Sequence, residues 1–248
     1  MKTLTTDRDP SPLSEAGAST AAQARFQRLH KILRERICLL DYAPGFQLGE
    51  EDLAREFGTS RTPIRRVLGW LESEGLIERR HGVGTIVTDV DLQSLEQVYR
   101  LRLELASLMG RLAPMRCSDA DLALLQNYLA RCDALRQHRD PTEFARLNMD
   151  FCVALFSMIG NAPLREITER VYFQTSRIWL KSVPAMDLED EISHFERQIF
   201  DVIEALRVGD HGAVGDICRA HISMSFNRMT PERQAQAGGP SLGATATA

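Results

Sequence analysis

The chain has 248 residues, of which 44% are hydrophobic and 26% charged, and its formal net charge is −4. This composition is typical of a globular protein, and the length allows one large domain or two smaller ones. No stretch approaches the roughly 18 uncharged apolar residues that span a bilayer, and the N-terminus lacks the apolar segment of a secretory signal. The cysteines are scattered, so we expect reduced thiols, a cytoplasmic protein and no membrane partner.

The charge is distributed unevenly along the chain. Residues 21–89 carry 11 Lys and Arg against 10 Asp and Glu, whereas residues 90–248 carry 17 against 21. A near-neutral segment still binds nucleic acid when its arginines share one face, because the attraction to phosphates acts locally. The net negative charge therefore does not exclude DNA binding by the first third of the chain.

The first third predicts three helices followed by a β-hairpin. Apolar residues at three- and four-residue spacing indicate helices, and the third begins with a capping Thr59-Ser60 pair and is stopped by Gly75. The period then changes to that of short strands around a Gly-rich turn. The helices are expected over 22–40, around 53–57 and over 59–74, and the strands over 76–80 and 85–88. This order of elements is that of a winged helix-turn-helix, which we predict for residues 21–89.

After Asp89 the strand pattern disappears and the chain is helical in period, with Pro and Gly residues at or near the breaks. The expected helices are 92–116, 119–138, 141–159, 162–182, 188–208 and 210–229. We therefore predict a mainly α protein, in which the winged helix-turn-helix is joined to an all-α helical-bundle sensor domain over residues 90–230. The two ends, 1–20 and 231–248, are poor in large apolar residues and are expected to be disordered.

The third helix carries residues suited to contacting DNA. Arg61 and Arg65 are four residues apart and share the face opposite the apolar stripe. Ser60, Arg61 and Thr62 lie at the helix N-terminus, where backbone N–H groups favour phosphate. An arginine fork grips the O6 and N7 atoms of guanine together. This helix is therefore the expected recognition helix.

Several short motifs lie within residues 22–88. They are Pro44-Gly45, Leu53-Ala54, Ser60-Arg61-Thr62-Pro63-Ile64-Arg65, Glu74-Gly75-Leu76-Ile77 and the His81-Gly82 turn. Together they resemble the DNA-binding domain of GntR-family bacterial repressors. The resemblance implies that operator DNA is contacted by the matching residues, namely Ser60, Arg61, Thr62, Arg65, His81 and Gly82. Arg66 stands where the family usually has Glu, and we expect it to add positive charge beside the DNA-facing surface.

A second set of motifs lies within residues 92–229. It comprises Tyr99-Arg100-Leu101-Arg102, Phe151-Cys152 followed by Gly160-Asn161 and Leu164, Ser193-His194-Phe195-Glu196, and Arg219-Ala220-His221-Ile222. These motifs are similar to the C-terminal sensor domain of FadR-type regulators, called FCD. The resemblance implies a homodimer on a palindromic double-stranded operator. It also implies a small-molecule effector, an organic acid, whose binding to the helical domain releases the DNA.

Many FCD proteins bind a divalent metal through one Asp or Asn and three His. The matching residues are Asn148, Cys152, His194 and His221, so a cysteine replaces the first histidine. A thiolate with two imidazoles and an amide oxygen suits zinc better than manganese or magnesium. Two other interpretations stay open. In the first, Cys152 is only a packed side chain of the hydrophobic core. In the second, the metal has been lost, and His194 and His221, with Asn148 beside them, bind the effector directly.

Arg102 is the residue expected to bind the acid group of the effector. The resemblance implies that the matching arginine faces the effector cavity, and a planar guanidinium fork suits a carboxylate. The acidic residue that the family has four positions later is Ala106 here, which leaves Arg102 without an intrahelical partner. A salt bridge between helices is the competing interpretation, and Arg146, Arg177 and Trp179 are further candidates.

Two other functions stay open on the sequence. In the first, the protein is a DNA-binding regulator whose helical domain is degenerate and responds to no effector. In the second, a metal-bound water makes the protein a hydrolase. The sequence contains no nucleophile elbow, P-loop, Rossmann glycine pattern or HExxH motif. We therefore predict a transcriptional regulator, a repressor of a catabolic or transport operon, and not an enzyme.

Overall fold

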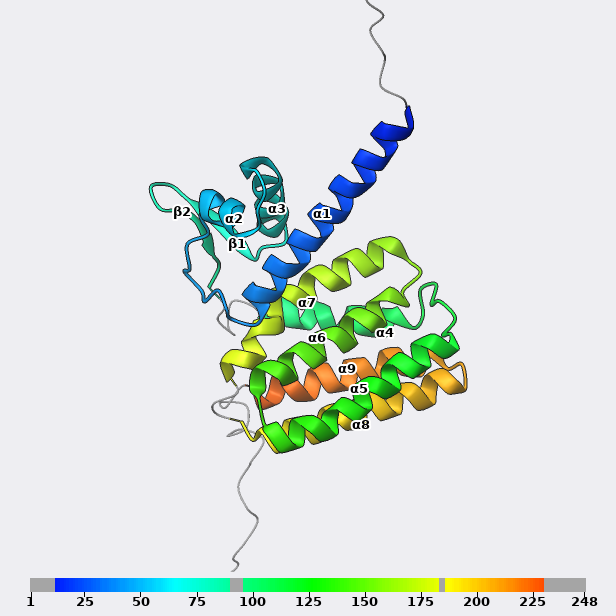
Figure 1. Ribbon diagram of the computed structural model, residues 1–248. Helices are drawn as coiled ribbons and strands as arrows, with labels where there is room; N and C mark the ends of the chain where they lie inside the picture. Colours follow the sequence, from blue (N-terminus) through cyan, green and yellow to red (C-terminus); the bar gives the residue numbers. More distant parts are fainter. Residues whose placement is uncertain (1–11, 90–95, 183–185, 230–248) are drawn as a thin grey trace, which may run out of the picture. The chain divides into compact units, whose positions relative to one another are not determined.

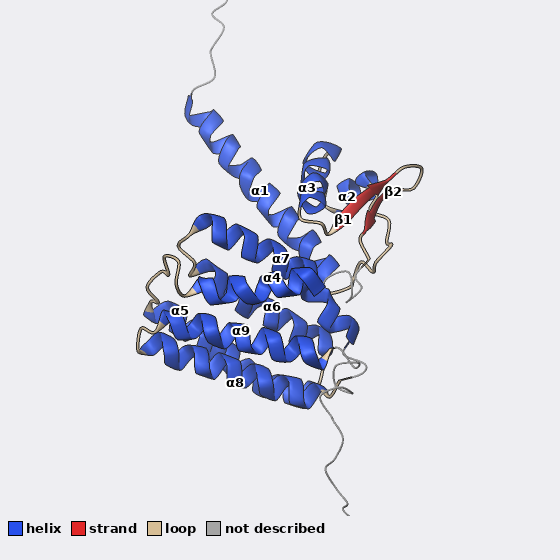
Figure 2. Ribbon diagram, turned by 180° about the vertical axis from the view of Figure 1, so that it is seen from behind, coloured by secondary structure: helices blue, strands red, loops and turns tan. Residues whose placement is uncertain are grey.

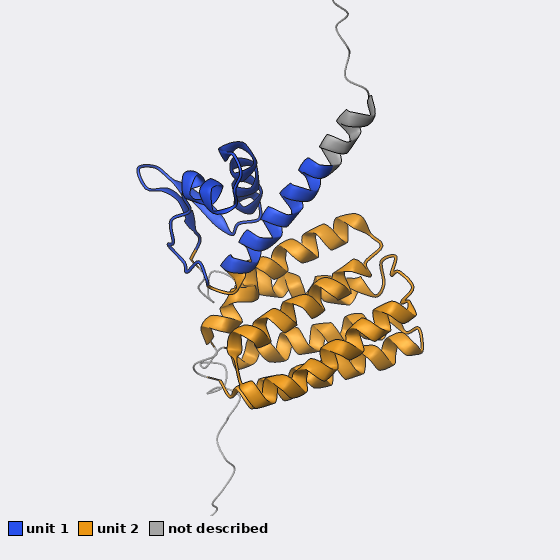
Figure 3. Cartoon of the chain, in the orientation of Figure 1, with its two compact units in different colours: residues 1–37, 41–88 blue, residues 38–40, 89–248 orange. Residues whose placement is uncertain are grey.

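The structure is a computed structural model that describes residues 12–89, 96–182 and 186–229. The chain divides into two compact units, one of residues 1–37 and 41–88 and the other of residues 38–40 and 89–248 (Figure 3). Helices dominate both units, and the sheet found in the described residues has two strands (Figure 2). Within the described ranges, no helix is both long and apolar enough to cross a membrane.

The first unit contains the three helices and the hairpin that the sequence predicts. These elements are α1 (Pro12–Cys38, whose last residue belongs to the second unit), α2 (Glu50–Glu56), α3 (Arg61–Ser73), β1 (Ile77–Arg80) and β2 (Gly84–Val87) (Figure 1). Their core is made by Leu33, Ile37, Ile64, Leu68, Leu71 and Leu76, none of which is more than 1% exposed. The predicted winged helix-turn-helix is confirmed.

The hairpin is formed by antiparallel strands in which Ile77 lies opposite Val87 and Arg80 lies opposite Gly84. Gly82 in the connecting turn has a φ of +76°, a left-handed conformation that glycine adopts without steric cost. Ile77 and Val87 are buried, whereas the residues of the turn are exposed. The hairpin is therefore anchored at its base and open to solvent at its tip.

Helix α1 begins earlier than the sequence analysis expects. Residues 12–20 are helical, so the expectation of disorder is corrected for this part of residues 1–20. The stretch is rich in alanine, which has the highest helix propensity, and Pro12 occupies the first position, where proline fits. Residues 1–11 and the expected disordered end at 231–248 lie outside the described residues.

Helix α3 begins as predicted, but without the expected side-chain cap. Ser60 occupies the N-cap position with an extended backbone, yet its hydroxyl makes no capping hydrogen bond. A capping side chain normally accepts from the second or third N–H of the helix. The third residue here is Pro63, which has no N–H. The cap is therefore weakened by the residue that follows it.

The second unit is the predicted all-α bundle. Its helices are α4 (Glu96–Met109), α5 (Asp119–His138), α6 (Pro141–Ser157), α7 (Ala162–Ser182), α8 (Leu188–Arg207) and α9 (His211–Arg228) (Figure 1). Helix α4 packs against α7 and α9, and α5 packs against α6 and α8. Four of the six starts carry a side-chain cap, made by Ser118, Asp140, Asp187 and Asp210. These caps explain why the predicted starts lie so close to the observed ones.

Helix α4 ends at Met109, earlier than the predicted residue 116. A helix that ran on from Met109 to residue 116 would include Pro114. The proline ring would then clash with the carbonyl of residue 110, four positions earlier. Gly110 also approaches α9, and a Cβ added there would lie 1.7 Å from the carbonyl oxygen of His211. A Cβ added at Gly215 would lie 2.8 Å from the carbonyl oxygen of Ala106. The backbones of α4 and α9 are thus in direct contact through two glycines, which we call the glycine seam. The expected residues 92–95 of this helix lie outside the described ranges.

Candidate functional site

The exposed face of α3 carries the predicted DNA-contacting residues. Ile64, Val67, Leu68 and Leu71 are buried on the opposite face. The exposed residues are Ser60, Arg61, Thr62 and Arg65. The helical period thus separates a core face from a polar face, as the sequence predicts.

An open groove in the first unit brings α3 and the hairpin together. We call it the hairpin groove, and its lining includes Glu50, Arg65, Arg79, Arg80, His81 and Gly82. Three of these were expected from the sequence, namely Arg65, His81 and Gly82. Arg79 and Arg80 were assigned only to a strand, although they add two cations to the same groove. The groove therefore combines the expected recognition helix with a basic hairpin, an arrangement suited to a phosphate backbone.

Glu50 pairs with two of the predicted DNA-contacting arginines, which the sequence analysis did not anticipate. Arg65 donates to it from Nε and Nη2, at 3.1 Å from Oε1 and 2.9 Å from Oε2. Arg61 Nη2 lies 3.5 Å from the same Oε2 atom. The hydrogen bonds from Arg65 hold the pKa of Glu50 below its ordinary value, so the carboxylate stays ionised. The only signal in the sequence was an acid in the first turn of α2, where the helix dipole already accounts for it.

Arg66 is exposed but does not line the hairpin groove, and the charge that it is expected to add beside the DNA-facing surface stays a prediction. Its guanidinium carbon lies 4.7 Å from the centre of the Phe26 ring of α1. Phe26 also packs against His30 and Trp70. Consecutive helical residues point about 100° apart, so the neighbour of Arg65 faces another element. The sequence could not show that α1 supplies an aromatic ring there.

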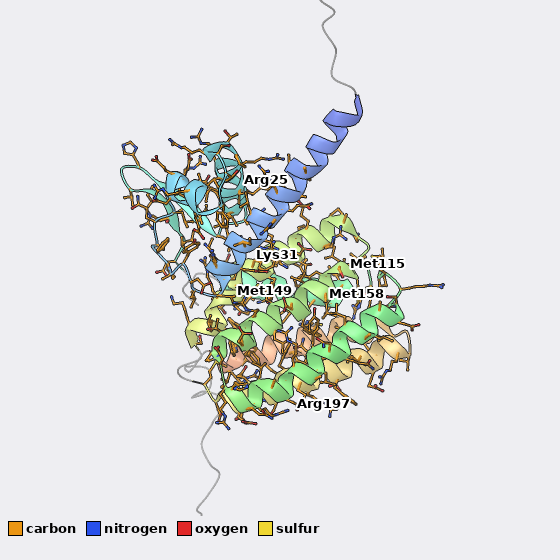
Figure 4. All side chains as sticks on the ribbon, viewed as in Figure 1. Arg25, Lys31, Met115, Met149, Met158 and Arg197 are labelled. Atoms are coloured by element: carbon orange, nitrogen blue, oxygen red, sulfur yellow. The ribbon has the colours of Figure 1, made fainter. Side chains whose placement is uncertain are left out.

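A cavity of about 110 Å³ in the second unit brings together the residues expected to bind an effector. We call it the main cavity. Its lining includes Arg102 of α4, Asn148 and Cys152 of α6, His194 of α8 and His221 of α9. Met149, labelled in Figure 4, and Trp179 also line it. Side chains far apart in the sequence thus converge on one cavity, while the further candidate Arg146 pairs with Glu143 instead.

The guanidinium of Arg102 is the basic group placed for an anion. Its Nη1 donates to Thr175 Oγ1 over 2.7 Å, and its Cζ lies 5.1 Å and 5.2 Å from the ring centres of Tyr99 and Tyr172. Among the residues that the structure describes, no carboxylate pairs with Arg102. The competing interpretation of a salt bridge between helices is therefore not supported. The cation is held in position by neutral groups and keeps donors for an acid group.

The other charged side chains of the main cavity neutralise one another. Glu191 is only 4% exposed. It accepts hydrogen bonds from Arg228 and from Trp179 Nε1, the latter at 3.1 Å. Removing either partner of such a buried ion pair destabilises the fold, because the other charge is left buried without a counter-ion. Glu191 and Arg228 thus form an ion pair with each other. Arg102 is the arginine of this cavity that has no carboxylate partner among the described residues, so it is the candidate to bind an anionic ligand.

The four expected metal ligands all line the main cavity, and metal binding by them stays a prediction. In the described part of the chain, no three His, Cys, Asp or Glu side chains are grouped so that they could hold a metal ion. Asn148 Oδ1 accepts from the Tyr172 hydroxyl at 3.3 Å and lies 3.9 Å from Cys152 Sγ. Burial raises the pKa of the Cys152 thiol to about 11, and burial lowers the pKa of His221. In the absence of a metal the Cys152 thiol is neutral, so zinc binding at these residues would have to displace its proton.

Family models match both units. The model for bacterial regulatory proteins of the gntR family matches residues 26–87. The model for the FCD domain matches residues 97–224. The first match covers the helices and hairpin around the hairpin groove, and the second covers nearly all helices around the main cavity.

The chain is also similar to individual regulators. The Nta operon transcriptional regulator of Aminobacter aminovorans is 27% identical, over 71% of this chain and 91% of its own length. The HTH-type transcriptional repressor RspR of Escherichia coli (strain K12) is 24% identical, over 79% of this chain and 85% of its own. The structure of E. coli McbR/YncC has a TM-score of 0.68 at 20% identity and covers 86% of this chain and 98% of that one. This last likeness shows a shared fold.

Proposed function

The chain belongs to the GntR family of transcriptional regulators with a C-terminal FCD domain, and from that premise we propose that it is a repressor released from its operator by a small organic acid. The family consists of regulators and not of enzymes. In this proposal the hairpin groove binds DNA and the main cavity binds the acid. Operator DNA also makes the cytoplasm its place of action.

The DNA-binding half of the proposal rests on the exposed face of α3 beside the hairpin. Arg61 and Arg65 would contact bases from α3, with Ser60 and Thr62 at the helix N-terminus on a phosphate. His81 and Gly82 would approach the adjacent backbone or groove. A homodimer would place two recognition helices in successive major grooves of a palindrome.

The single observation that carries the effector half is Arg102. It is a cavity-lining cation without a carboxylate partner among the described residues, and it is held in position by Thr175. Such a group favours a ligand that brings its own negative charge. Asn148, His194 and His221 surround the remainder of the ligand with hydrogen-bonding groups. RspR is a transcriptional repressor by name, which supports the proposed direction of regulation.

Gel-shift titrations with the promoter DNA next to the gene test the proposal. The Arg61→Ala, Arg65→Ala double variant should lose at least about 30-fold in affinity, since each base-contacting arginine contributes roughly 1–3 kcal/mol. Arg207→Ala removes an exposed charge of the second unit and serves as the control. Release of wild-type protein by a pool of two- to six-carbon acids supports the sensor. Unchanged binding by the double variant contradicts the DNA-binding half, and failure of the pool to release the DNA contradicts the effector half.

A further inference from the structure

A second, smaller cavity of about 40 Å³ adjoins the main cavity. Arg102, Cys152 and Tyr172 line both. Most of the residues that line only the smaller cavity are apolar, namely Ala106, Met109, Leu155, Phe156, Val171 and Cys218. By volume it has room for about three water-sized groups. The polar main cavity therefore continues into a short apolar compartment, and Arg102 lies where they meet.

The apolar compartment contains one unexplained polar atom. Thr168 lines it and is 6% exposed, and its hydroxyl oxygen has no hydrogen-bond partner among the described residues. Burying a hydroxyl without a partner costs folding free energy, and such groups are rare in native proteins. A ligand atom that reaches Thr168 would satisfy this hydroxyl.

Helix α7 sets the distance between the two polar ends. Thr168, Tyr172 and Thr175 follow one another at helical spacing and share one face. Thr175 is the residue that holds Arg102. Seven residues separate Thr168 from Thr175, which is two helical turns or roughly 10 Å. Arg102 and the Thr168 hydroxyl thus mark the ends of a site of defined length.

We propose that the effector is a short acid with a second oxygen at the far end of its chain. Its carboxylate binds Arg102, about three to four methylene groups occupy the apolar compartment, and a terminal hydroxyl or carbonyl oxygen pairs with Thr168. The inference rests on the proposed function, since it names the class of molecule that the same sensor binds. It predicts selectivity by chain length as well as by charge.

Calorimetric titration with four acids tests the inference, namely acetate, pentanoate, 5-hydroxypentanoate and octanoate. For the wild-type protein we expect pentanoate to bind at least about 10-fold more tightly than acetate, and octanoate to bind more weakly than pentanoate. We expect 5-hydroxypentanoate to bind a further 5-fold or more tightly, because it satisfies the Thr168 hydroxyl. In Thr168→Val the two five-carbon acids should bind alike, while acetate binding is unchanged.

The controls separate the inference from the proposed function. Thr168→Val keeps the shape of the side chain and removes an unpaired hydroxyl, so the variant should unfold at the same temperature as the wild type or higher. Thr142→Val lies outside both cavities and should retain the preference for the hydroxy acid. Suppose that acetate binding depends on Arg102, but that neither chain length nor Thr168 affects binding. This result would overturn the inference about the apolar compartment and leave the proposed function standing. Failure of all four acids to bind would overturn the inference, whereas the proposed function would fall only if the acid pool also failed to release the DNA.

Discussion

The side chain of Arg65 is oriented before any DNA is present. Glu50 accepts from its Nε and Nη2 groups, and the remaining Nη1 edge of the fork is left for an outside acceptor. Because the planar guanidinium presents its donors in a fixed geometry, binding one edge directs the other. A side chain held in this way loses less conformational entropy when it contacts a base. In the proposed function, Glu50 would act as a positioning residue for DNA recognition.

Replacing Glu50 with Gln should weaken discrimination between DNA sequences. Removal of the carboxylate frees the charges of Arg61 and Arg65, so we expect affinity for random-sequence DNA to rise about 3- to 10-fold. The plot of log K against log salt should become steeper by about 1, the change for one more phosphate contact. Operator affinity should rise less, because Arg65 is no longer oriented. Fluorescence anisotropy at several salt concentrations measures all three quantities.

Glu51→Gln provides the matched control for this variant, since it removes an exposed acid from the same turn of α2. It should leave the ratio of operator to random-sequence affinity unchanged. If the two variants behave alike, the effect is one of net charge and the positioning role of Glu50 is wrong.

The arrangement of the side chains around Cys152 leads to a prediction about metal. Asn148, Cys152, His194 and His221 line one cavity, yet within the described residues no three His, Cys, Asp or Glu side chains are grouped so that they could hold a metal ion. We therefore expect elemental analysis of the purified protein to find less than about 0.1 zinc per chain. Cys152→Ser should retain carboxylate affinity within about threefold. Stoichiometric zinc that disappears in Cys152→Ser would contradict the reasoning and restore the metal site.

At the scale of elements, the glycine seam determines how closely α4 and α9 approach. A methyl group at Gly110 would meet the backbone carbonyl of His211 at 1.7 Å, and rotation of a side chain cannot relieve a clash with backbone. The seam matters for the sensor, because α4 carries Arg102 and α9 carries His221. A small change in the separation of these helices would alter the main cavity directly.

Gly110→Ala should destabilise the second unit by about 1–3 kcal/mol or more, the usual cost of overpacking. Gly69→Ala is the matched control, since Gly69 lies within α3 and an added Cβ there meets nothing within 4 Å. That variant should be stabilised by about 0.5–1 kcal/mol through helix propensity. Urea denaturation followed by circular dichroism measures both. Equal stabilities would mean that the helices separate at little cost.

Most elements were predictable from the sequence because local rules specify them. Period three or four marks the helices, and caps such as Asp140 with Pro141 mark their starts. The end of α4 was misplaced, since it depends on Pro114 and on contact with a helix about 100 residues later. Glu50 and Thr168 were missed for a related reason. Their roles depend on what folding places around them, which is a pair of arginines for Glu50 and, within the described residues, no hydrogen-bond partner for the Thr168 hydroxyl.

At the scale of the whole molecule, the proposed function requires that occupation of the main cavity lowers affinity for DNA. Thermodynamic linkage makes this reciprocal, so operator DNA must also lower affinity for the acid by the same factor. The two units meet this requirement only if the helical domain has two arrangements that bind the acid differently. A substitution of Arg102 can separate the effect on acid binding from the effect on DNA binding.

Arg102→Gln should bind the operator within about threefold of the wild-type affinity, because the residue lies outside the first unit. It should no longer be released by the two- to six-carbon acids that release the wild type by 10-fold or more. Arg100→Gln removes an exposed charge from the same helix and should respond normally. Gel-shift titration with and without the acids measures the response. A normal response by Arg102→Gln would place the acid elsewhere.

The pairing of Glu50 with two arginines has a consequence for the search through a genome. A chromosome presents millions of competing sites, so occupancy of the operator depends on the ratio of specific to non-specific affinity more than on either alone. A carboxylate that neutralises part of the groove lowers the affinity for every random site at once. The regulator would then spend less time bound to non-specific DNA. Fewer copies per cell would therefore suffice to repress one promoter.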